Sequence, residues 1–501
     1  MSPSSLYPRP DLGALRSFIS RTWPNTSLAA LDSLAADAGV TQDSRQVTPG
    51  MLFIAANGAA GDGRAYIDHA LAQGAVAVLA EAPLATADSH ILVLDDLNAH
   101  LPALIAALYP LSQQGVHIAV TGTNGKSSVT HYIVALLNAM GERAALIGTL
   151  GMGEPGKLVA SGFTTPHMLT VAQQAARWHA DGIRYVVLEA SSHALDQGRL
   201  DSIPLHVGVF TNLTRDHLDY HGSMLAYAAA KARLFRRPEL QSAIVNAHDE
   251  HVRLMLAGCQ RPVTTIDAYG GVADIRATHW LPTQTGQQVT LATHEREFEL
   301  TLPLLGRFNL DNVLLAVATL QALGFELAHL LNAAASLQAV PGRMQLIIQP
   351  GQPVVVVDYA HTPDALDNAL TALHQHVPGR LWAIIGCGGN RDNGKRPQMA
   401  AIAERQADHV VLTDDNPRTE DPEHIRQQML AGLQHPDAVW NIGDRRQAIS
   451  AVINDADSAD VVLIAGKGHE DYQDIQGIKH PFDDAKVAAE ILAAQAQKEK
   501  S

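Results

Sequence analysis

Residues 116–140 read VHIAVTGTNGKSSVTHYIVALLNAM and carry the clearest structural pattern in the middle of the chain. Val116–Val120 is rich in β-branched residues and predicts a short buried strand. Gly122 and Gly125 follow in a polar loop, and an apolar-periodic helix is expected to run to about Met140. Strand, glycine-containing loop and helix in this order form the setting in which backbone N–H groups bind phosphate. The stretch therefore predicts a phosphate-binding loop in an α/β domain.

The loop ends in Gly125-Lys126-Ser127, as a Walker A loop does, but it lacks the first glycine of that pattern. Val120 stands at that position. The Lys126 ammonium is expected to reach the β and γ phosphates of a nucleotide, and the Ser127 hydroxyl to ligate Mg²⁺. The alternative is a glycine-containing turn that binds nothing, and the strand and amphipathic helix on either side argue against it.

The composition is that of a globular protein without a nucleic-acid surface. Hydrophobic residues make up 47% of the 501 residues and charged residues 17%, which argues against disorder. The net charge of −15 disfavours nucleic-acid binding, because neutralising phosphates requires a basic face. At roughly 100–200 residues per domain, the length suggests about three domains.

The sequence predicts a cytoplasmic protein. Its two cysteines, Cys259 and Cys387, lie far apart, which fits a reducing compartment, and Cys387 is expected to pack in a glycine-rich turn. The N-terminus, Met1-Ser2-Pro3, lacks a basic segment followed by an apolar run, so no signal peptide is expected. No stretch approaches the roughly 18 apolar residues of a membrane helix, so no membrane partner is expected either.

Three domains are expected, at residues 1–112, 113–340 and 341–501. The first mixes strands at 51–56 and 75–79 with helices at 66–73 and 101–108. Strands expected in the second, at 116–120, 185–188, 207–210 and 243–245, alternate with helices, which predicts a mainly parallel sheet covered on both faces. Further strands at 354–357, 381–385, 409–412 and 461–465 predict a second doubly wound α/β unit.

Polar side chains follow two strands of the central domain. Glu189 ends one strand, where it could ligate Mg²⁺ as a hard oxygen donor or cap the next helix. Asp216, His217, Asp219 and His221 crowd behind another strand, where the alternatives are a metal or phosphate site and a hydrated loop. Strand ends of one parallel sheet lie at one edge, so these side chains could converge on the phosphate loop.

The third domain carries candidate nucleotide contacts near its start. Asp358 follows a strand and is placed for ribose or base contacts, and His361 is placed for phosphate. Arg343, in the preceding turn, could reach the γ-phosphate when domains close, or could be a surface residue of a linker.

Three later loops of the third domain, each after a strand, combine basic, amide and acidic side chains. They are Gly386 to Pro397, which contains Arg391, Asp415-Asn416-Pro417-Arg418, and Gly466-Lys467-Gly468-His469-Glu470. The arginines suit bidentate pairing with carboxylates, and Glu470 suits an ammonium group. The set predicts a site for a zwitterionic amino acid with an additional carboxylate.

The chain resembles the Mur ligase family over essentially its full length. The pattern from Ala119 to Ser127 is shared by Mur ligases and folylpolyglutamate synthetases. Further phrases match the Mur ligases in order, namely Asp43-Ser44-Arg45, Asp62-Gly63-Arg64, Ser191-Ser192-His193, Asp216-His217-Leu218-Asp219, Gly342-Arg343, Asp358-Tyr359-Ala360-His361 and the three later loops. The resemblance implies an N-terminal α/β uridine-binding domain, a central P-loop ATPase-type parallel sheet and a C-terminal Rossmann-like domain.

The resemblance also implies an activity in bacterial cell-wall synthesis. An ADP-forming ligase would join meso-diaminopimelate to UDP-N-acetylmuramoyl-L-alanyl-D-glutamate through an acyl phosphate. ATP would be a substrate and Mg²⁺ a cofactor, and the protein is expected to be a monomer.

The resemblance assigns roles to individual residues. Catalytic roles fall to Lys126, Glu189, His217 and Lys231. ATP would contact Gly122, Thr123, Asn124, Gly125, Lys126, Ser127, Ser128, Asn309, Arg343, Asp358 and His361. Mg²⁺ would be held by Ser127, Glu189, His217 and a carbamylated Lys231, because carbamylation turns an ammonium into a carboxylate-like donor.

The substrate sites are implied in the same way. The UDP-muramoyl-dipeptide would contact Ser44, Thr164, Thr165, Ser191, Gln197 and Arg199. Diaminopimelate would contact Arg391, Asp415, Asn416, Arg418, Gly466 and Glu470, with Arg418 taking the distal carboxylate.

Two departures and three alternatives accompany the resemblance. Phe163 stands where some members have Asn, which puts one substrate contact in doubt, and Ser127 replaces the commoner Thr. A lysine-adding ligase is the nearest alternative, and Arg418 argues against it because lysine has no distal carboxylate. The N-terminal phrases argue against a folylpolyglutamate synthetase, and the C-terminal loops argue against a non-catalytic P-loop module.

Overall fold

The computed structural model describes residues 8–58, 61–85, 88–111 and 115–498. The chain forms two compact units, one of residues 1–126, 133–245 and 249–264, the other of residues 127–132, 246–248 and 265–501. The domain boundary predicted at residue 112 and the N-terminal residues used to exclude a signal peptide lie outside the described residues. The boundary predicted at residue 340 stays a prediction.

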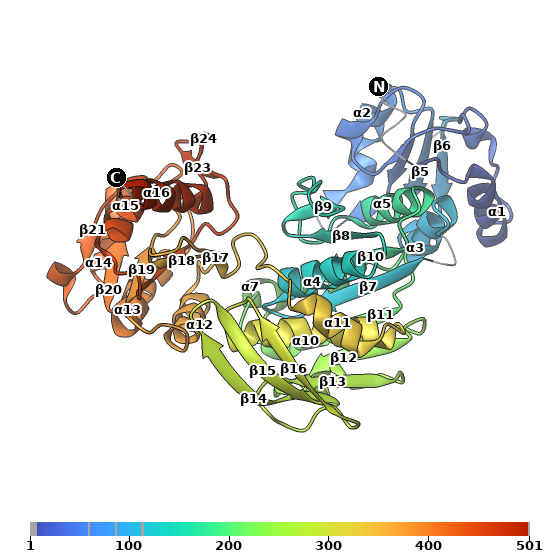
Figure 1. Ribbon diagram of the computed structural model, residues 1–501. Helices are drawn as coiled ribbons and strands as arrows, with labels where there is room; N and C mark the ends of the chain where they lie inside the picture. Colours follow the sequence, from blue (N-terminus) through green and yellow to red (C-terminus); the bar gives the residue numbers. More distant parts are fainter. Residues whose placement is uncertain (1–7, 59–60, 86–87, 112–114, 499–501) are drawn as a thin grey trace. The chain divides into compact units, whose positions relative to one another are not determined.

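The first unit begins with a four-stranded parallel sheet of order β1-β2-β5-β6 (Figure 1). Its elements are β1 (Val40–Thr41), β2 (Leu52–Ala55), β5 (Ala77–Glu81), β6 (Ile91–Leu94), α1 (Leu12–Thr22), α2 (Ile67–Ala72) and α3 (Leu97–Leu108), with a small ribbon of β3 (Asn57–Gly58) and β4 (Gly61–Asp62). Strands β2 and β5 are buried throughout, so both faces of the sheet are covered. The strands and helices predicted here are confirmed within a few residues.

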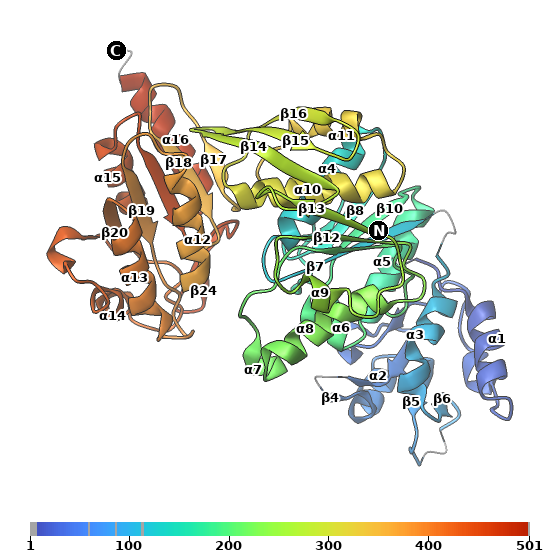
Figure 2. The same cartoon turned by 90° about the horizontal axis from the view of Figure 1, so that it is seen from below.

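The rest of the first unit contains six strands in the order β12-β11-β7-β10-β8-β9, parallel except for β9. The strands are β7 (Val116–Thr121), β8 (Ala144–Gly148), β9 (Gly151–Gly153), β10 (Tyr185–Glu189), β11 (Val207–Phe210) and β12 (Ser242–Asn246). The helices are α4 (Lys126–Ala139), α5 (Met168–Ala180), α6 (Ser192–Asp196), α7 (Leu218–His221), α8 (Met224–Ala232) and α9 (Val252–Met255). Helices α6 and α8 lie side by side (Figure 2). The four strands predicted in this region are confirmed.

The second unit contains two consecutive antiparallel hairpins, formed by three strands, that the sequence interpretation missed. Strands β14 (Ile275–Thr283), β15 (Gly286–Ala292) and β16 (Glu297–Leu302) pair antiparallel, after β13 (Val263–Asp267), and are followed by α10 (Arg307–Ala322) and α11 (Leu327–Ala334). Along β15 buried and less buried residues alternate from Gln287 to Leu291, the period-2 pattern of a sheet with one solvated face. The prediction of a mainly parallel sheet for the middle of the chain is therefore incomplete, because it did not include these antiparallel strands.

The end of the chain forms a six-stranded sheet of order β17-β18-β22-β19-β20-β21, parallel except for β17. The strands are β17 (Gln345–Ile347), β18 (Val354–Asp358), β19 (Leu381–Ile385), β20 (His409–Leu412), β21 (Trp440–Asn441) and β22 (Val461–Ala465). The helices are α12 (Pro363–His374), α13 (Lys395–Gln406), α14 (Pro422–Leu430), α15 (Arg445–Asp455) and α16 (Asp484–Lys498), and a separate hairpin consists of β23 (Tyr472–Ile475) and β24 (Ile478–Pro481). Short 3₁₀ turns elsewhere cover Ala29–Leu31, Ser44–Gln46, Gly63–Tyr66, Arg233–Arg236 and Pro436–Ala438.

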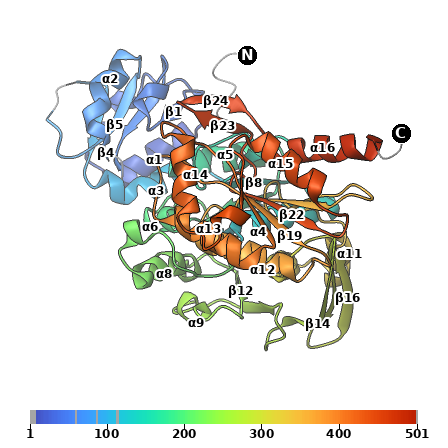
Figure 3. The same cartoon turned by 90° about the vertical axis from the view of Figure 1, so that its left-hand side faces the viewer.

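Both faces of this last sheet are buried, as the unbroken apolar run Val354–Val357 predicts. Val354 and Val356 pack with residues of α12, α13 and α14, whereas Val355 and Val357 pack with residues of α15 and α16. Figure 3 shows β19 and β22 between α13 and α15. The predicted doubly wound unit is confirmed.

In the described parts of the chain, no helix combines the length and the apolar character that crossing a membrane requires.

A buried ion pair joins the two helices on one face of this sheet. The Arg445 guanidinium donates from Nε to Asp484 Oδ1 and from Nη2 to Asp484 Oδ2, each over 2.7 Å, and neither side chain is exposed. Replacing Asp484 with Ala should lower the free energy of unfolding by about 3–5 kcal/mol, because it leaves a buried charge without its partner. Chemical denaturation of the purified protein measures this loss.

The matched control is Glu490→Ala. It breaks an ion pair between the same two helices, Arg446–Glu490, whose side chains are 53% and 62% exposed. That loss should stay below about 1 kcal/mol. If the two variants lost equal amounts of unfolding free energy, burial would not be the reason for the larger effect expected at Asp484.

Candidate functional site

The predicted phosphate loop has the expected strand–loop–helix setting. Strand β7 ends at Thr121 and α4 begins at Lys126, with Gly125 as its N-cap at φ 83°. The Lys126 ammonium folds back over the loop and donates to the carbonyls of Gly122 at 3.0 Å and Thr123 at 2.8 Å. These carbonyls hold the charge at the helix N-terminus, which is where phosphate oxygens bind.

Residues after β11 anchor the loop. The Thr123 N–H donates to the Asn212 carbonyl at 2.8 Å, and the Asn124 N–H to Asn212 Oδ1 at 2.9 Å. Thr211 Oγ1 donates to the Asn124 carbonyl at 2.6 Å. Gly122, at φ 151°, leaves no room for a side chain, because a Cβ atom there would lie 1.8 Å from Thr211 Oγ1. The loop is therefore held in one shape by the neighbouring strand end.

Lys231 is brought to the same loop from helix α8. Its side chain is buried, 1% exposed, and its Nζ donates to the Gly122 carbonyl at 2.7 Å. Burial lowers the pKa of Lys231 well below its usual value, and the nearby charge of Lys126 lowers it further. Tyr227, one helical turn earlier, contributes a ring 4.5 Å from Nζ and a hydroxyl 3.1 Å from Thr123 Oγ1. The sequence interpretation missed Tyr227, although its spacing from Lys231 could have indicated it.

His217 lies beside these lysines with a second histidine. Its backbone is left-handed at φ 53°, and its ring lies 4.9 Å from that of His193. Burial lowers the pKa of His217, and the neighbouring carboxylate of Asp216, 3.4 Å away, opposes that shift. Burial also lowers the pKa of His193. Neutral imidazoles are the form that binds metal ions.

Glu189 is buried at the end of β10, 1% exposed. Its carboxylate accepts hydrogen bonds from Thr149, from the backbone N–H at 2.9 Å and from the hydroxyl at 3.1 Å. Gly148 makes this possible, since a Cβ atom there would lie 2.2 Å from Glu189 Oε1. Thr149, which the sequence interpretation missed, therefore fixes the orientation of the carboxylate.

Most residues predicted for the muramoyl-dipeptide lie together in the first unit. Thr165 Oγ1 contacts the Glu189 carbonyl at 2.6 Å and Ser191 Oγ at 3.2 Å, and Arg199 donates to the Thr165 carbonyl at 2.8 Å. Gln197 Oε1 accepts from Arg199, and Thr164 Oγ1 lies 3.1 Å from Thr149 Oγ1.

Two further residues bear on this group. Phe163 is exposed and lies under the Arg199 guanidinium, 5.6 Å from ring centre to Cζ. It offers an apolar ring where an Asn would offer an amide. Ser44 is buried in the short turn Ser44–Gln46 of the preceding sheet region.

Three of the predicted nucleotide contacts meet in the second unit, around Tyr359. The Arg343 guanidinium lies 4.6 Å from the Tyr359 ring centre, and the His361 ring lies 4.5 Å from it. Asp358 accepts from the N–H groups of Met344 at 2.7 Å and Ala360 at 2.8 Å, and burial raises its pKa. The Asp358 carboxylate thus orders the turn that carries Arg343.

Asn309 lies elsewhere in that unit, buried at the start of α10. Its Oδ1 accepts from the Tyr132 hydroxyl at 3.3 Å, and its Nδ2 donates to the Leu305 carbonyl at 2.8 Å. The side chain holds the beginning of the helix in place.

The residues predicted for the amino acid meet at the carboxyl ends of β20 and β22. Asn416 donates to Glu470 Oε2 at 2.7 Å. Gly466 lies against Asp415, since a Cβ atom on it would be 2.6 Å from Asp415 Oδ2. Arg418 Nη1 donates to the Gly389 carbonyl at 2.7 Å, whereas the Arg391 side chain is exposed. Asp415, Asn416, Arg418, Gly466 and Glu470 therefore form one group.

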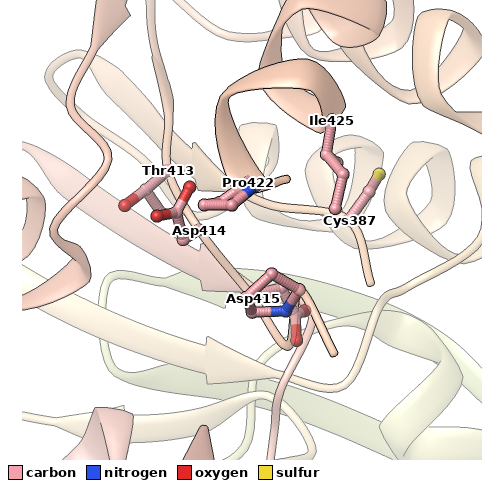
Figure 4. A pocket seen from close by; sticks show the side chains of 7 residues that line it. Cys387, Thr413, Asp414, Asp415, Pro422 and Ile425 are labelled. Atoms are coloured by element: carbon pink, nitrogen blue, oxygen red, sulfur yellow. The ribbon is translucent and has the colours of Figure 1, made fainter. Parts of the chain in front are cut away.

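A small pocket lies behind this group, lined by Cys387, Thr413, Asp414, Asp415, Pro417, Pro422 and Ile425 (Figure 4). Cys387 is buried, and burial raises the pKa of its thiol to about 12. Its sulfur lies 3.7 Å from Met399 Sδ. A thiol in that state packs rather than reacts, as predicted.

Three family models match the chain. One described as "Mur ligase family, catalytic domain" matches residues 38–126, one described as "Mur ligase middle domain" residues 120–320, and one described as "Mur ligase, glutamate ligase domain" residues 342–468.

Curated proteins named UDP-N-acetylmuramoyl-L-alanyl-D-glutamate–2,6-diaminopimelate ligase are similar along nearly all of the chain. The protein from Xylella fastidiosa (strain 9a5c) is 45% identical over 471 residues, 92% of this chain and 95% of that protein. The one from Pseudomonas aeruginosa is 46% identical over 462 residues, 91% of this chain and 95% of that protein.

Solved structures give the same likeness. A structure that carries the same ligase name aligns with a TM-score of 0.71 at 39% identity, over 91% of this chain and 95% of that one. A MurF ligase from Thermotoga maritima in complex with ADP aligns with a TM-score of 0.61 at 19% identity, over 92% of this chain and 98% of that one, which is a likeness of fold alone.

The shape of the phosphate loop can be tested with Gly122→Ala. The added Cβ atom would displace Thr211 or the loop, so ADP binding should weaken by about 100-fold, measured by calorimetry. Gly141→Ala is the matched control, because Gly141 also has a positive φ, 84°, but open space around its Cβ position. It should cost about 1–2 kcal/mol of stability and leave ADP binding unchanged. Equal ADP binding by the two variants would argue against the loop as the phosphate site.

Proposed function

This chain belongs to the Mur ligase family, and from that premise we propose that it joins meso-diaminopimelate to UDP-N-acetylmuramoyl-L-alanyl-D-glutamate in an ATP-dependent, ADP-forming reaction of peptidoglycan synthesis. The observation that carries the proposal is similarity along 92% of the chain, at 45% identity, to a protein named for that reaction. The grouping of Arg418, Asn416 and Glu470 after β20 and β22, the two strands that flank β19, supports the amino-acid specificity.

The reaction would proceed through an acyl phosphate. ATP transfers its γ-phosphoryl group to the D-glutamate carboxylate, and the amine of diaminopimelate then attacks the activated carbonyl and displaces phosphate. The backbone N–H groups of the loop and the Lys126 ammonium would bind and neutralise the transferred phosphoryl group. Phosphate oxygens would take the place of the two carbonyls that Lys126 now contacts. Catalysis would rest on positioning and charge, without a covalent enzyme intermediate.

Lys231, Glu189 and His217 would hold Mg²⁺, with Lys231 as a carbamate and Ser127 as a further ligand. When bound there, the metal would supply neutralisation of the charge that develops during phosphoryl transfer. Two observations support these residues. The Glu189 carboxylate is fixed by Thr149. Burial and the nearby Lys126 lower the pKa of Lys231, which favours the neutral amine that reacts with carbon dioxide.

The remaining site residues would bind substrates. Thr164, Thr165, Ser191, Gln197 and Arg199 would hold the muramoyl-dipeptide, with Ser44 at the uridine, and Asn309, Arg343, Asp358 and His361 would contact the nucleotide. Arg418 and Arg391 would pair with carboxylates of diaminopimelate, and Glu470 with an ammonium group. We propose a cytoplasmic monomer that acts on these small molecules, without nucleic-acid or membrane partners. The net charge of −15 supports the exclusion of nucleic acid.

Phosphate release tests the reaction and its amino-acid specificity. Purified protein with ATP, Mg²⁺ and UDP-N-acetylmuramoyl-L-alanyl-D-glutamate should release phosphate with meso-diaminopimelate and not with L-lysine, because only diaminopimelate has a distal carboxylate to pair with Arg418. A preference for lysine would keep the family and overturn the specificity. If neither amino acid caused phosphate release, the result would favour the alternative of a non-catalytic nucleotide-binding module.

Carbamylation of Lys231 can be observed directly. With ¹³C-bicarbonate, the wild-type protein should give a carbamate carbon signal that disappears on acidification and is missing from Lys231→Arg. That variant should lose at least about 100-fold in kcat, because a cation would replace a ligand of the metal. Lys157→Arg, at an exposed lysine of the same unit, is the control and should keep both signal and activity. A full signal from the Lys231 variant would place the carbamate elsewhere.

A further inference from the structure

Lys467 is a buried lysine to which the proposed reaction gives no role. Its side chain is 0% exposed, in the loop after β22, one residue beyond Gly466. Its Nζ donates to the Tyr472 carbonyl and to Asn416 Oδ1, the latter at 3.3 Å, and lies 3.6 Å from Glu470 Oε2. The ammonium group therefore contacts two of the residues predicted to bind the amino acid.

The hydrogen bonds around Asn416 fix the orientation of its amide. The backbone N–H of Asp474 donates to Asn416 Oδ1 at 2.9 Å. A backbone N–H and an ammonium can only donate, so the atom that faces Asp474 and Lys467 must be the oxygen. Asn416 Nδ2 is then forced toward Glu470 and donates to its Oε2. If the amide were turned the other way, its NH₂ group would face the Asp474 N–H and the Lys467 ammonium, which are both donors.

The hairpin of β23 and β24 also forms hydrogen bonds with the loop of residues 415–418, which contains Asn416. The Arg418 N–H donates to the Asp474 carbonyl at 2.9 Å, and the Gln476 N–H donates to the Arg418 carbonyl at 2.7 Å. Gln473 Nε2 donates to the Asp415 carbonyl at 3.0 Å. Because Lys467 binds the Tyr472 carbonyl at the start of this hairpin, it connects the hairpin to Asn416 and Glu470.

Lys467 and Asn416 approach the same oxygen of Glu470. Both contacts fall on Oε2, at 3.6 Å from Lys467 Nζ and 2.7 Å from Asn416 Nδ2. The second oxygen, Oε1, takes part in neither of these two contacts. A carboxylate held in this way presents one oxygen, in a fixed direction, to a further cation.

We propose that Lys467 is a positioning residue for the incoming amino acid, which fixes the Asn416 amide and the Glu470 carboxylate so that Glu470 Oε1 receives an ammonium group of the substrate. The inference rests on the proposed function, since it concerns the same amino-acid site. It assigns Asn416 chiefly to orienting Glu470. The hairpin also contributes to the site in this proposal, because its Asp474 N–H fixes the orientation of the Asn416 amide.

Lys467→Met tests the proposal, because it keeps the length of the side chain and removes its donors. The KM for meso-diaminopimelate should rise roughly 10- to 100-fold, the range expected when hydrogen bonds to a buried charged group are lost. The KM values for ATP and the muramoyl-dipeptide and the kcat should stay close to wild type. Lys479→Met is the matched control, since Lys479 is exposed and lies over the Tyr472 ring on the outer strand of the same hairpin, 4.0 Å from its centre. It should keep the wild-type KM for the amino acid.

A double-mutant cycle separates positioning from general damage to the loop. If Lys467 acts through Glu470, the variant K467M/E470Q should have nearly the same KM for diaminopimelate as E470Q alone. Additive losses, or an unchanged KM in K467M, would overturn the proposal.

Asn416→Asp decides the question if Lys467→Met does not fold. It keeps the acceptor for Lys467 and the Asp474 N–H but places a carboxylate against Glu470, so it should also raise the KM for diaminopimelate selectively. A folded N416D protein with the wild-type KM would contradict the proposal. Failure of the wild-type protein to consume diaminopimelate would instead contradict the proposed function.

Discussion

The register of three parallel strands determines where the predicted site residues of the first unit lie. Glu189, the last residue of β10, lies opposite Val120, and Phe210, the last residue of β11, lies opposite Thr121. The phosphate loop, the Glu189 carboxylate and the Thr211-Asn212 anchor therefore begin at the same level of the sheet. A one-residue slip would turn each side chain to the opposite face and separate these groups.

That arrangement brings two lysine Nζ atoms to one carbonyl. Lys126 and Lys231 both donate to the oxygen of Gly122, at 3.0 and 2.7 Å. The charge of Lys126 disfavours a charge on Lys231, and an anion between the two side chains would relieve this repulsion. We therefore expect the loop to bind phosphate, and carbamylation of Lys231 would relieve the repulsion in a second way.

The sequence alone predicted the elements better than their contacts. Apolar runs such as Val354–Val357 identify buried strands whatever surrounds them, because their length and composition suffice. The hairpins β14–β16 were missed, since short alternating segments of Gln, Thr and Val carry a weak signal. Lys231 was identified only through the family resemblance, because one lysine in an Ala-rich helix gives no physical sign of burial. Partners such as Thr149 and Lys467 depend on tertiary contacts, which no local pattern contains.

The buried pair of Arg445 and Asp484 has a consequence for how the protein is made. Val487, Ala488 and Leu492 of α16 complete the core on one face of the last sheet, and Asp484 of the same helix neutralises Arg445. During synthesis, β18 to β22 are finished before this helix exists. Until residues 484–492 leave the ribosome, that face exposes valine and isoleucine side chains next to an unpaired arginine. The nascent chain therefore passes through a stage open to aggregation, which ends only with the last helix.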